Sequence, residues 1–339
     1  MKNVAIAILN YNGKEHLKTF LPSVIQNSDQ ATIYIIDNAS IDDSIAFLKS
    51  NYPEIQIIQN SANLGFAGGY NEGMKSIQEE LVVLLNSDVE VTNNWLAPLI
   101  EAMNNKNFAG CQPKIKSYLE RDKFEHAGAC GGYLDKDYFP FCRGRIVKHF
   151  ETDFGQYDNA ESVFWVSGAA FMIRNSVFKE IEGFDVDFFA HMEEIDLCWR
   201  IQKSGKYFQV IPSSEVFHLG GGTLAYDSPT KLYLNFRNNL FMIIKNHPGY
   251  LLPKLSFRMV LDGLAAIKFI TEGKPRLCLV VFLAHMSIYA NFVKFYRKRL
   301  VLKKFKSKPK GIYAGSIIWA SMIQGNKTFT SLNQRKWIH

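Results

Sequence analysis

Residues 4–13 read VAIAILNYNG, an unbroken apolar run of strand length that ends in a polar turn. Further apolar runs occupy residues 33–36, 55–58 and 81–85, and helical patterns fill the gaps at residues 14–26, 44–51 and 67–78. Unbroken apolar runs of this length indicate strands that are covered on both faces. The alternation therefore predicts right-handed βαβ units and an α/β fold with a doubly wound, mainly parallel sheet and flanking helices.

Polar residues follow three of these predicted strands. They are Asn10 and Asn12 after the first, Asp37 and Asn38 after the second, and Asn86 and Asp88 after the fourth. Capping or turn formation explains any one of them, but ligands of doubly wound sheets bind at the carboxyl ends of the strands. The repetition at three strand ends favours a nucleotide-sized ligand.

A glycine-rich segment, NLGFAGGYN at residues 63–71, opens the third helical pattern. Its spacing is not G-x-G-x-x-G and no Walker-type Gly-Lys-Ser occurs, which argues against a dinucleotide fold and against a P-loop. The glycines either bring backbone N–H groups near a phosphate or permit tight packing of a helix on the sheet.

The second half of the chain holds a cluster of acids. Residues 188–200 read FFAHMEEIDLCWR, with Glu193, Glu194 and Asp196 within four residues. Burying carboxylates this closely costs free energy unless a metal, a cationic group or a proton-transfer task offsets it. The dipole of a helix that starts here explains Asp196 and one glutamate, but explains three acids beside aromatic residues less well.

The segments around this cluster are expected to be mixed. Residues 111–160 show no regular pattern, which predicts a loop-rich insertion that covers the site. We expect a strand at residues 162–173, interrupted by small residues at 167–170, then a helix at 195–203 and a strand at 208–211.

The composition describes an ordinary folded protein with a basic tail. Of 339 residues, 47% are apolar and 21% charged, and the net charge of +7 divides into −8 for residues 1–250 and +15 for residues 251–339. Five cysteines without a C-x-x-C pair argue against a disulfide framework or zinc cage. The first apolar run lacks a small-residue cleavage site, so we expect a cytoplasmic protein.

The tail contains a 17-residue apolar run at residues 277–293, short of the ~20 residues that span a bilayer. Nine lysines and arginines follow it up to residue 310. An apolar helix beside a polybasic segment predicts peripheral contact of residues 277–310 with an anionic membrane. The alternatives are a core helix with a solvated basic exit, and nucleic-acid binding. Since no nucleic-acid motif accompanies the lysines, we expect no nucleic-acid partner.

Seven short motifs occur along the chain in a characteristic order. They are NYN at 10–12, IDNAS at 36–40, NLGFAGG at 63–69, LNSDV at 85–89, WVSGA at 165–169, GFD at 183–185 and EEIDL at 193–197. In this order they resemble family 2 glycosyltransferases of the GT-A fold, and most closely the bacterial rhamnosyltransferase-like branch. The resemblance implies a GT-A domain at residues 1–245, with a nucleotide-binding half (1–110) and an acceptor half (111–245). A helical, basic region at 246–339 follows.

The resemblance also implies which residues bind the donor and a metal. The donor nucleotide would contact Asn10, Asn12, Asp37, Asn38, Asn63, Gly65 and Asn86. Asp88 matches the last acid of the family's D-x-D-type motif and would bind Mg²⁺ or Mn²⁺, with Glu90 and His218 as further ligands. The chain departs from the full motif, because Asn86 stands where a first Asp often lies. A lone His is also frequently structural.

On the acceptor side, the resemblance places Glu194 as the general base, with Glu193 and Asp196 supporting it. Trp165 and Gly168 would contact the sugar or the acceptor, although Trp165 is equally compatible with a place in the core. The expected activity is an inverting hexosyl- or rhamnosyltransferase. It moves a sugar from a UDP- or dTDP-linked donor to a hydroxyl of a glycan or lipid-linked saccharide, in cell-surface polysaccharide synthesis at the inner face of the cell membrane.

Two alternative functions would require other residues than those in this sequence. A sugar-nucleotide nucleotidyltransferase would need a basic, glycine-rich triphosphate loop near the N-terminus, and the sequence has none. A catalytically silent, membrane-tethered nucleotide-sugar or glycan-binding protein would have lost the acids at positions 88 and 194, and both are acidic here.

Overall fold

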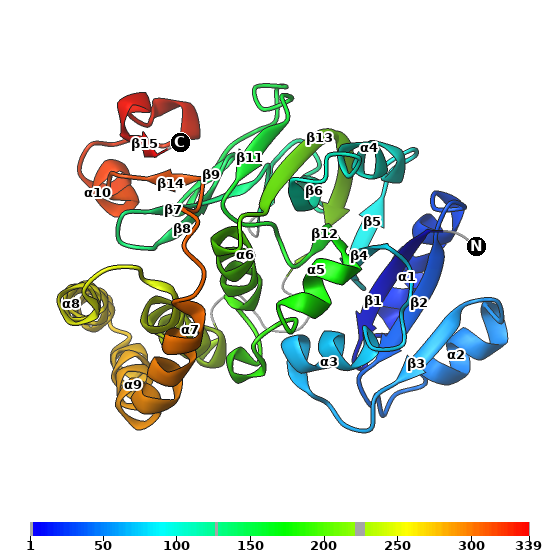
Figure 1. Cartoon of the computed structure of the whole chain (residues 1–339), viewed down its shortest axis with the longest axis horizontal. Helices are drawn as coiled ribbons and strands as arrows, with labels where there is room; N and C mark the ends of the chain where they lie inside the picture. The colour runs from blue at the N-terminus through cyan, green and yellow to red at the C-terminus, as the bar shows by residue number, and fades with distance from the viewer. Residues whose placement is uncertain (1–2, 126–127, 221–227, 339) are drawn as a thin grey trace.

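A computed structural model describes residues 3–125, 128–220 and 228–338 of the chain. Within them a central mixed sheet of nine strands has the order β11-β13-β6-β12-β4-β1-β2-β3, with β5 paired to β13. The N-terminus lies at one end of the molecule, and the long C-terminal helices lie at the other (Figure 1).

The N-terminal half of the sheet is parallel. Its strands are β1 (Val4–Asn10), β2 (Thr32–Asp37), β3 (Gln56–Gln59) and β4 (Leu81–Asn86), and its helices are α1 (Lys14–Gln26), α2 (Ser44–Asn51) and α3 (Gly65–Gly73). β1 pairs in parallel with both β2 and β4. The strand order reverses beside β1, which is where doubly wound sheets bind ligands. The predicted strands and the first two helices are confirmed, whereas the third helix starts and ends earlier than predicted.

Glycine lets α3 lie close to the sheet. A Cβ on Gly69 would lie 2.8 Å from Leu9 Cδ1, and one on Gly73 would lie 2.4 Å from Ile36 Cδ1. Of the two readings of the glycine-rich segment, tight helix–sheet packing accounts for these two residues.

The C-terminal half of the sheet mixes directions. It contains β5 (Val89–Val91), β6 (Phe108–Ser117), β11 (Glu161–Val163), β12 (Ala170–Arg174) and β13 (Tyr207–His218), with α4 (Leu96–Ala102), α5 (Asn175–Glu180), the 3₁₀ turn η1 (Val186–Phe188) and α6 (Glu193–Lys203). β12 runs antiparallel between β4 and β6. β13 continues beyond Pro212 to His218, because a register shift after Ile211 absorbs the missing donor and parallel pairing with β6 resumes.

The segment predicted as a loop-rich insertion instead builds most of a second sheet. Its strands are β7 (Gly132–Asp135), β8 (Pro140–Cys142), β9 (Arg145–Ile146) and β10 (His149–Phe150), completed by β14 (Ile312–Tyr313) and β15 (Trp337–Ile338) from the tail. Strands of two to four residues are too short to show an apolar alternation, so the sequence pattern missed them.

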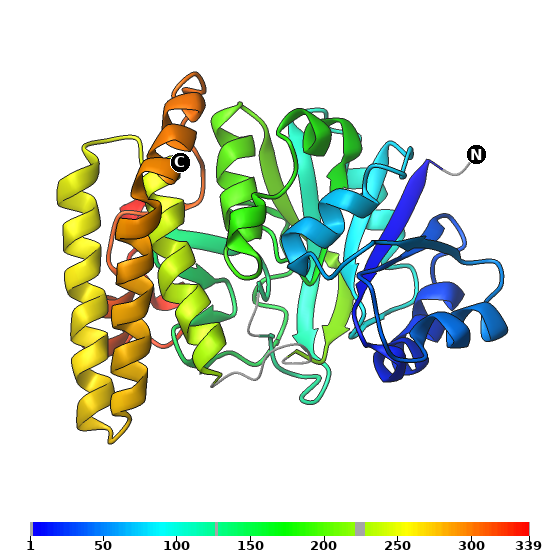
Figure 2. The ribbon, with the colours of Figure 1, turned by 90° about the horizontal axis from the view of Figure 1, so that it is seen from below.

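The C-terminal helices form the far end of the molecule (Figure 2). They are α7 (Pro229–Asn246), α8 (Leu251–Thr271) and α9 (Pro275–Leu302), followed by α10 (Ile317–Met322) and the 3₁₀ turns η2 (Phe329–Ser331) and η3 (Gln334–Lys336). Phe241 of α7 stacks on Phe295 of α9, with ring centroids 3.8 Å apart. Among the described residues α9 alone is long and apolar enough to cross a membrane, judged by length and composition.

Candidate active site

The carboxyl ends of β1 and β2 meet, as the strand pattern predicted. Asn10 Nδ2 donates to Asp37 Oδ1 at 3.1 Å, and Ser40 N donates to Asp37 Oδ2 at 3.0 Å. Asn10 and Asp37 are both buried. The Asp37 carboxylate therefore organises the turn after β2, and lone pairs remain on its oxygens for a ligand.

Asn38 and Asn63 connect this strand end to α3. Asn38 Nδ2 donates to Asn63 Oδ1 and to the Gly65 carbonyl, each at 3.0 Å, while Asn38 Oδ1 accepts from Leu64 N at 3.2 Å. Asn38 is thus saturated by protein partners. Its side chain holds the glycine-rich turn in place.

Gly65 lies where this donor-side turn meets the acidic loop. Its φ is +69°, and a Cβ there would lie 2.6 Å from Phe189 Cδ2. The two residues that follow, Phe66 and Ala67, donate their N–H groups to the Phe189 carbonyl at 3.0 and 3.3 Å. Glycine is required at this position because the backbone is left-handed and the loop approaches closely.

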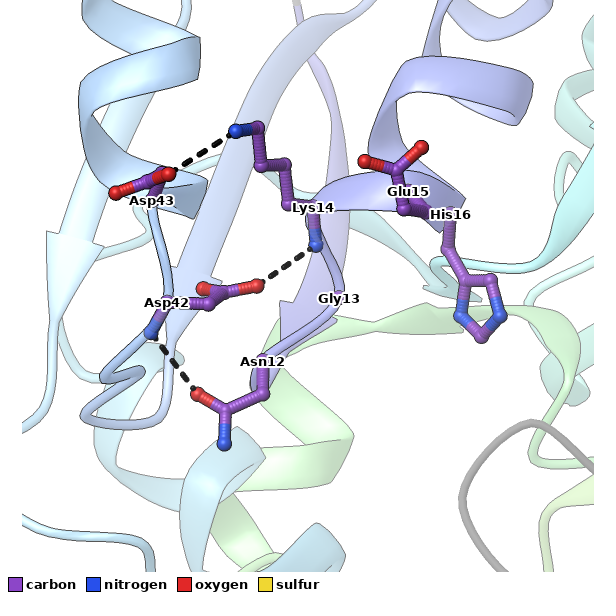
Figure 3. A pocket seen from close by; sticks show the side chains of 7 residues that line it. All are labelled: Asn12, Gly13, Lys14, Glu15, His16, Asp42 and Asp43. Carbon is purple, nitrogen blue, oxygen red and sulfur yellow. Dashed lines mark hydrogen bonds and ion pairs between the residues drawn. The ribbon is translucent and has the colours of Figure 1, made fainter.

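A cavity of about 360 Å³ opens beside these strand ends (Figure 3). It is lined by Asn12, Gly13, Lys14, Glu15, His16, Asp42 and Asp43. Asn12 Oδ1 accepts from Ile41 N at 2.8 Å, and Asp42 Oδ2 accepts from Lys14 N at 3.1 Å. The cavity lies at the N-terminus of α1, whose dipole favours an anion, but the carboxylates of Glu15, Asp42 and Asp43 also line it, and the Lys14 ammonium is already paired with Asp43 at 3.1 Å. Sequence reasoning missed Lys14 and His16, whose signal is their place in the first helical turn after β1.

Asp88 and His218 meet at the edge of this region. His218 Nε2 lies 3.2 Å from Asp88 Oδ1, and His218 Nδ1 lies 3.5 Å from Glu125 Oε2. Burial lowers the pKa of His218, but the Asp88 and Glu125 carboxylates outweigh it and raise that pKa to about 10. Burial opposes ionisation of Asp88, yet His218 holds the pKa of Asp88 below its usual value. Asn86 Nδ2 lies 3.5 Å from the same imidazole nitrogen.

Glu90 lies apart from Asp88 and His218. Its two carboxylate oxygens accept from Arg121 Nη1 and Nη2 at 2.8 and 2.9 Å. A turn at residues 87–88 interrupts the extended backbone, so Glu90 does not continue the direction of Asp88. In the part of the chain that the structure describes, no group of three His, Cys, Asp or Glu side chains could hold a metal ion. The carboxylate that lies beside His218, together with Asp88, is that of Glu125, and no sequence spacing indicated Glu125 as a site residue.

The loop that precedes the acidic cluster is strained. Phe189, His191 and Met192 have φ values of 63°, 69° and 71°. Left-handed conformations of such residues cost about 1–3 kcal/mol each and persist only where the surroundings enforce them. Asn238 of α7 holds the loop in this conformation, because its Nδ2 donates to the carbonyls of Phe188, Ala190 and His191 at 2.9, 2.9 and 2.7 Å. Asn238 is fully buried.

The three acids of the cluster differ in their surroundings. Asp196 is saturated: Arg200 Nε, Lys245 Nζ and Asn246 Nδ2 donate to it at 2.8, 2.7 and 2.7 Å. Although burial opposes ionisation, Lys245 and Arg200 hold the pKa of Asp196 below its usual value. Asp196 is therefore a permanent anion that joins α6 to α7.

Glu193 and Glu194 differ from Asp196 in their hydrogen bonding. The Oε2 atom of each is buried and has no hydrogen-bond partner among the described residues. Burial and the neighbouring Glu194 raise the pKa of Glu193 well above its usual value. Burial also raises the pKa of Glu194, to about 7, while backbone donors limit the rise. Glu193 is 4% exposed, whereas Glu194 is partly exposed although its Oε2 atom is buried, so Glu194 is the more accessible of the two residues.

Lys231 of α7 joins the two acidic regions electrostatically. Burial and the Lys231 charge lower the pKa of His191 to about 4. Burial lowers the pKa of Lys231 itself, and Glu125 partly opposes this. The Lys231 ammonium therefore interacts electrostatically both with His191 and with Glu125, the carboxylate beside His218.

The two residues predicted to contact a sugar lie differently from each other. Trp165 is 3% exposed and donates from Nε1 to the Tyr133 carbonyl at 3.0 Å. Its ring packs on Gly132, where a Cβ would lie 2.1 Å from Trp165 Cε2. This core position leaves no ring face open for stacking. Gly168 is partly exposed and faces Phe66, since a Cβ there would lie 3.2 Å from Phe66 Cζ.

Several known proteins are similar to this chain in sequence or in fold. The sequence model of the family described as "Glycosyl transferase family 2" matches residues 5–182. An N-acetylglucosaminyl-diphospho-decaprenol L-rhamnosyltransferase of Mycobacterium tuberculosis is 23% identical over 287 residues, which cover 78% of this chain and 90% of the relative. The rhamnosyltransferase WbbL of Escherichia coli is 23% identical, with 63% of this chain and 83% of WbbL covered.

Solved structures support the fold. GalNAc-T7 with UDP, GalNAc and Mn²⁺ superposes with a TM-score of 0.59 and 15% identity, over 95% of this chain and 56% of that longer chain. The mannosyltransferase PcManGT of Pyrobaculum calidifontis, in complex with GDP-Man and Mn²⁺, gives a TM-score of 0.52 and 11% identity, with 89% and 84% covered. The expected GT-A fold is thereby confirmed, and by its family match the chain belongs to glycosyl transferase family 2, as a glycosyltransferase of the rhamnosyltransferase-like kind.

Proposed function

We propose that this glycosyltransferase is inverting and that Glu194 is its general base. The observation that carries the proposal is the difference between the three neighbouring acids. Asp196 is saturated and its pKa is held low, burial and Glu194 raise the pKa of buried Glu193 well above its usual value, and burial raises the pKa of the partly exposed Glu194 to about 7. A general base works best when its pKa lies near the working pH.

The reaction follows from one base and a good leaving group. The acceptor hydroxyl loses its proton to the Glu194 carboxylate as its oxygen bonds to the anomeric carbon. The bond from that carbon to the donor's diphosphate breaks at the same time, and the nucleoside diphosphate leaves with the electron pair. Because attack and departure occur on opposite faces, the configuration at that carbon inverts.

Asp88 and His218 are the residues that would hold a divalent cation, Mg²⁺ or Mn²⁺. A carboxylate and an imidazole nitrogen face each other at 3.2 Å, and the Glu125 carboxylate lies 3.5 Å from the second ring nitrogen, as carboxylates do beside metal-bound histidines. Because Asp88 and Glu125 raise the pKa of His218 to about 10, cation binding would require the imidazole to lose a proton, and the remaining ligands would come from the donor and water. When bound, the cation would balance the charge that develops on the departing diphosphate.

The donor site is proposed at the strand ends. The nucleotide would lie along Asn10, Asp37 and Asn63, beside the cavity at the start of α1. UDP or dTDP is the proposed nucleotide. Support comes from the polar side chains that meet at the ends of β1 and β2, and from two related folds that were solved with nucleotides and Mn²⁺.

The proposed acceptor is a lipid-linked saccharide used in cell-surface polysaccharide synthesis. The mycobacterial relative is named for a decaprenol-linked substrate. Such a substrate resides in a membrane, so the enzyme would work at the cytoplasmic face of the cell membrane. Residues 277–310 are proposed to make the peripheral contact.

A donor panel tests the proposal. The protein is incubated with UDP- and dTDP-sugars and Mn²⁺ or Mg²⁺, and nucleoside diphosphate release and the anomeric configuration of the product are recorded. We expect release from one donor class, loss of release in EDTA, and an inverted product. A retained configuration would contradict the single-base mechanism, and absence of release from every donor would favour a silent binding protein.

A further inference from the structure

The outer surface of α8 is apolar over most of its length. Every residue of α8 and α9 is described, and between positions 252 and 267 each exposed side chain of α8 is uncharged. The large exposed ones are Leu252, Phe257, Val260, Leu264 and Ile267, each between 48% and 67% exposed. Soluble monomers rarely expose apolar surface of this extent, so the face is expected to be covered by something.

The neighbouring helix extends the same surface. α9 packs beside α8 at the end of the molecule, and a three-residue turn makes the two helices antiparallel (Figures 1 and 2). From position 279 to 293 the exposed side chains of α9 are also uncharged. Leu279, Phe282, Leu283, Tyr289 and Val293 are 49% to 65% exposed. We define these ten side chains of the two helices as the hairpin face.

Exposed positive charge follows α9 in the chain. Lys303, Lys304, Lys306 and Lys308 come directly after this helix and are all exposed. An apolar helix face together with a polybasic segment matches the surface of an anionic bilayer, which offers hydrocarbon beneath negative headgroups.

Other basic residues of α9 serve the enzyme instead of a lipid. Lys298 Nζ pairs with Asp185 Oδ1 at 2.5 Å and Asp187 Oδ2 at 2.6 Å, and Lys294 Nζ pairs with Asp187 Oδ1 at 2.6 Å. Arg299 is buried and donates to backbone carbonyls, including that of Gly249 at 2.8 Å. These bonds fix α9 to the turn that leads into the strained loop before Glu193.

The same bonds determine how the helices can meet a membrane. α9 is fixed to the catalytic domain near its C-terminal end, and α8 near its N-terminal end, where Lys254 Nζ pairs with Asp137 Oδ1 at 2.8 Å. The turn between the helices exposes Glu272 and Lys274, and Arg276 in the first turn of α9 is exposed as well. Crossing a bilayer would separate the helices from the domain or carry charges through hydrocarbon.

We propose that the hairpin face lies flat on an anionic lipid bilayer, with α8 and α9 parallel to the membrane plane. This deepens, and rests on, the proposed function with its lipid-linked acceptor. α9 then has two contacts: one side meets the membrane, and Lys294 and Lys298 hold the loop before the base. The sugar end of a membrane-embedded acceptor is brought to Glu194 by this arrangement.

The test is vesicle flotation of the full chain on phosphatidylcholine, with and without phosphatidylglycerol. We expect flotation with the anionic lipid and release from the vesicles by alkaline carbonate. The double variant Leu264→Glu/Ile267→Glu should lose about tenfold or more of its vesicle partitioning. Replacing Lys303, Lys304, Lys306 and Lys308 with serine should lower partitioning on anionic vesicles by up to about a thousandfold. The matched control is Phe154→Glu, an even more exposed apolar residue outside the helices, which should float like the wild type.

Three outcomes would overturn the proposal. The first is flotation of the double variant to the same extent as the control. The second is retention of the wild type on the vesicles after carbonate, which would mean that the helices cross the membrane. The third is a stable dimer, seen in light scattering, that the double variant abolishes. Circular dichroism and thermal unfolding confirm that the variants fold. Nucleoside diphosphate release with a water-soluble acceptor is measured in parallel, so failure of the proposed function is separate from failure of membrane docking.

Discussion

Asn238→Ala tests whether α7 holds the catalytic loop. The substitution removes the N–H donor that reaches three loop carbonyls. The Phe188 carbonyl keeps other donors, Ala190 N at 2.7 Å and Arg237 Nη2 at 3.2 Å. The carbonyls of Ala190 and His191 therefore bear the loss.

The size of the effect follows from those two carbonyls. An unsatisfied buried acceptor costs about 1–3 kcal/mol, so the loop conformation loses about 2–6 kcal/mol relative to alternatives. Three left-handed residues favour release of the loop once its anchor is gone. Even the lower value shifts the equilibrium constant between the competent loop and its alternatives about 30-fold, which is the upper limit of the resulting decrease in the competent fraction.

The assay is steady-state release of nucleoside diphosphate, with thermal unfolding measured beside it. We expect kcat to fall by as much as about 30-fold at the lower value, while KM for the donor changes less than about threefold, because the donor site lies on other elements. Asn239→Ala is the matched control. Asn239 is the adjacent, equally buried residue of α7, but it donates to the Tyr138 carbonyl at 3.0 Å and does not contact the loop.

The Asn239→Ala variant should lose stability and keep its kcat. The reasoning is refuted if Asn238→Ala keeps its kcat, or if the two variants lose it equally.

Three further predictions follow from the same geometry. Lys245→Met removes the cation between buried Asp185 and Asp196, and we expect a loss of about 3–5 kcal/mol of stability and roughly 10 °C in Tm, measured by thermal unfolding; an unchanged Tm would contradict it. A base with a pKa of about 7 should make kcat/KM fall about tenfold per pH unit below that value, and a profile flat down to pH 5 would exclude Glu194. The raised pKa of Glu194 means that the free energy of unfolding falls as the pH rises towards 7, because the buried carboxyl must then ionise. Glu194→Gln removes this loss, so it should raise Tm at pH 8 and much less at pH 5. Equal shifts in Tm at the two pH values would argue against a destabilising carboxylate at this position.

The nucleotide-binding half of the fold was predictable because its signals are local. Long apolar runs marked β1, β2, β3 and β4, and polar residues at their ends indicated where a ligand binds. Asn10 and Asp37 touch as expected, since parallel strands end at one edge of a sheet. The acidic cluster was also visible, because carboxylates beside aromatic residues are rare without a task.

The remaining features depend on partners far apart in the sequence. Asn238 lies 47 residues from the carbonyl of His191, and Glu125 meets His218 only in three dimensions. Turn geometry, not residue type, separated Glu90 from Asp88 and joined it to Arg121. The resemblance to family 2 glycosyltransferases had already assigned the base role to Glu194, but the different surroundings of the acids 193, 194 and 196 became visible only in the structure.

The most direct test of the account is the rate of nucleoside diphosphate release by Glu194→Gln, compared with Glu193→Gln, on the preferred donor and acceptor. Glutamine keeps the shape of the side chain but cannot accept the hydroxyl proton, so we expect Glu194→Gln to lose about 100-fold or more in kcat. Glu193 is buried, and burial and Glu194 raise its pKa well above the usual value, so Glu193→Gln should lose less than about tenfold. Undiminished release by Glu194→Gln, or an equal loss in both variants, would contradict the claim that Glu194 is the base.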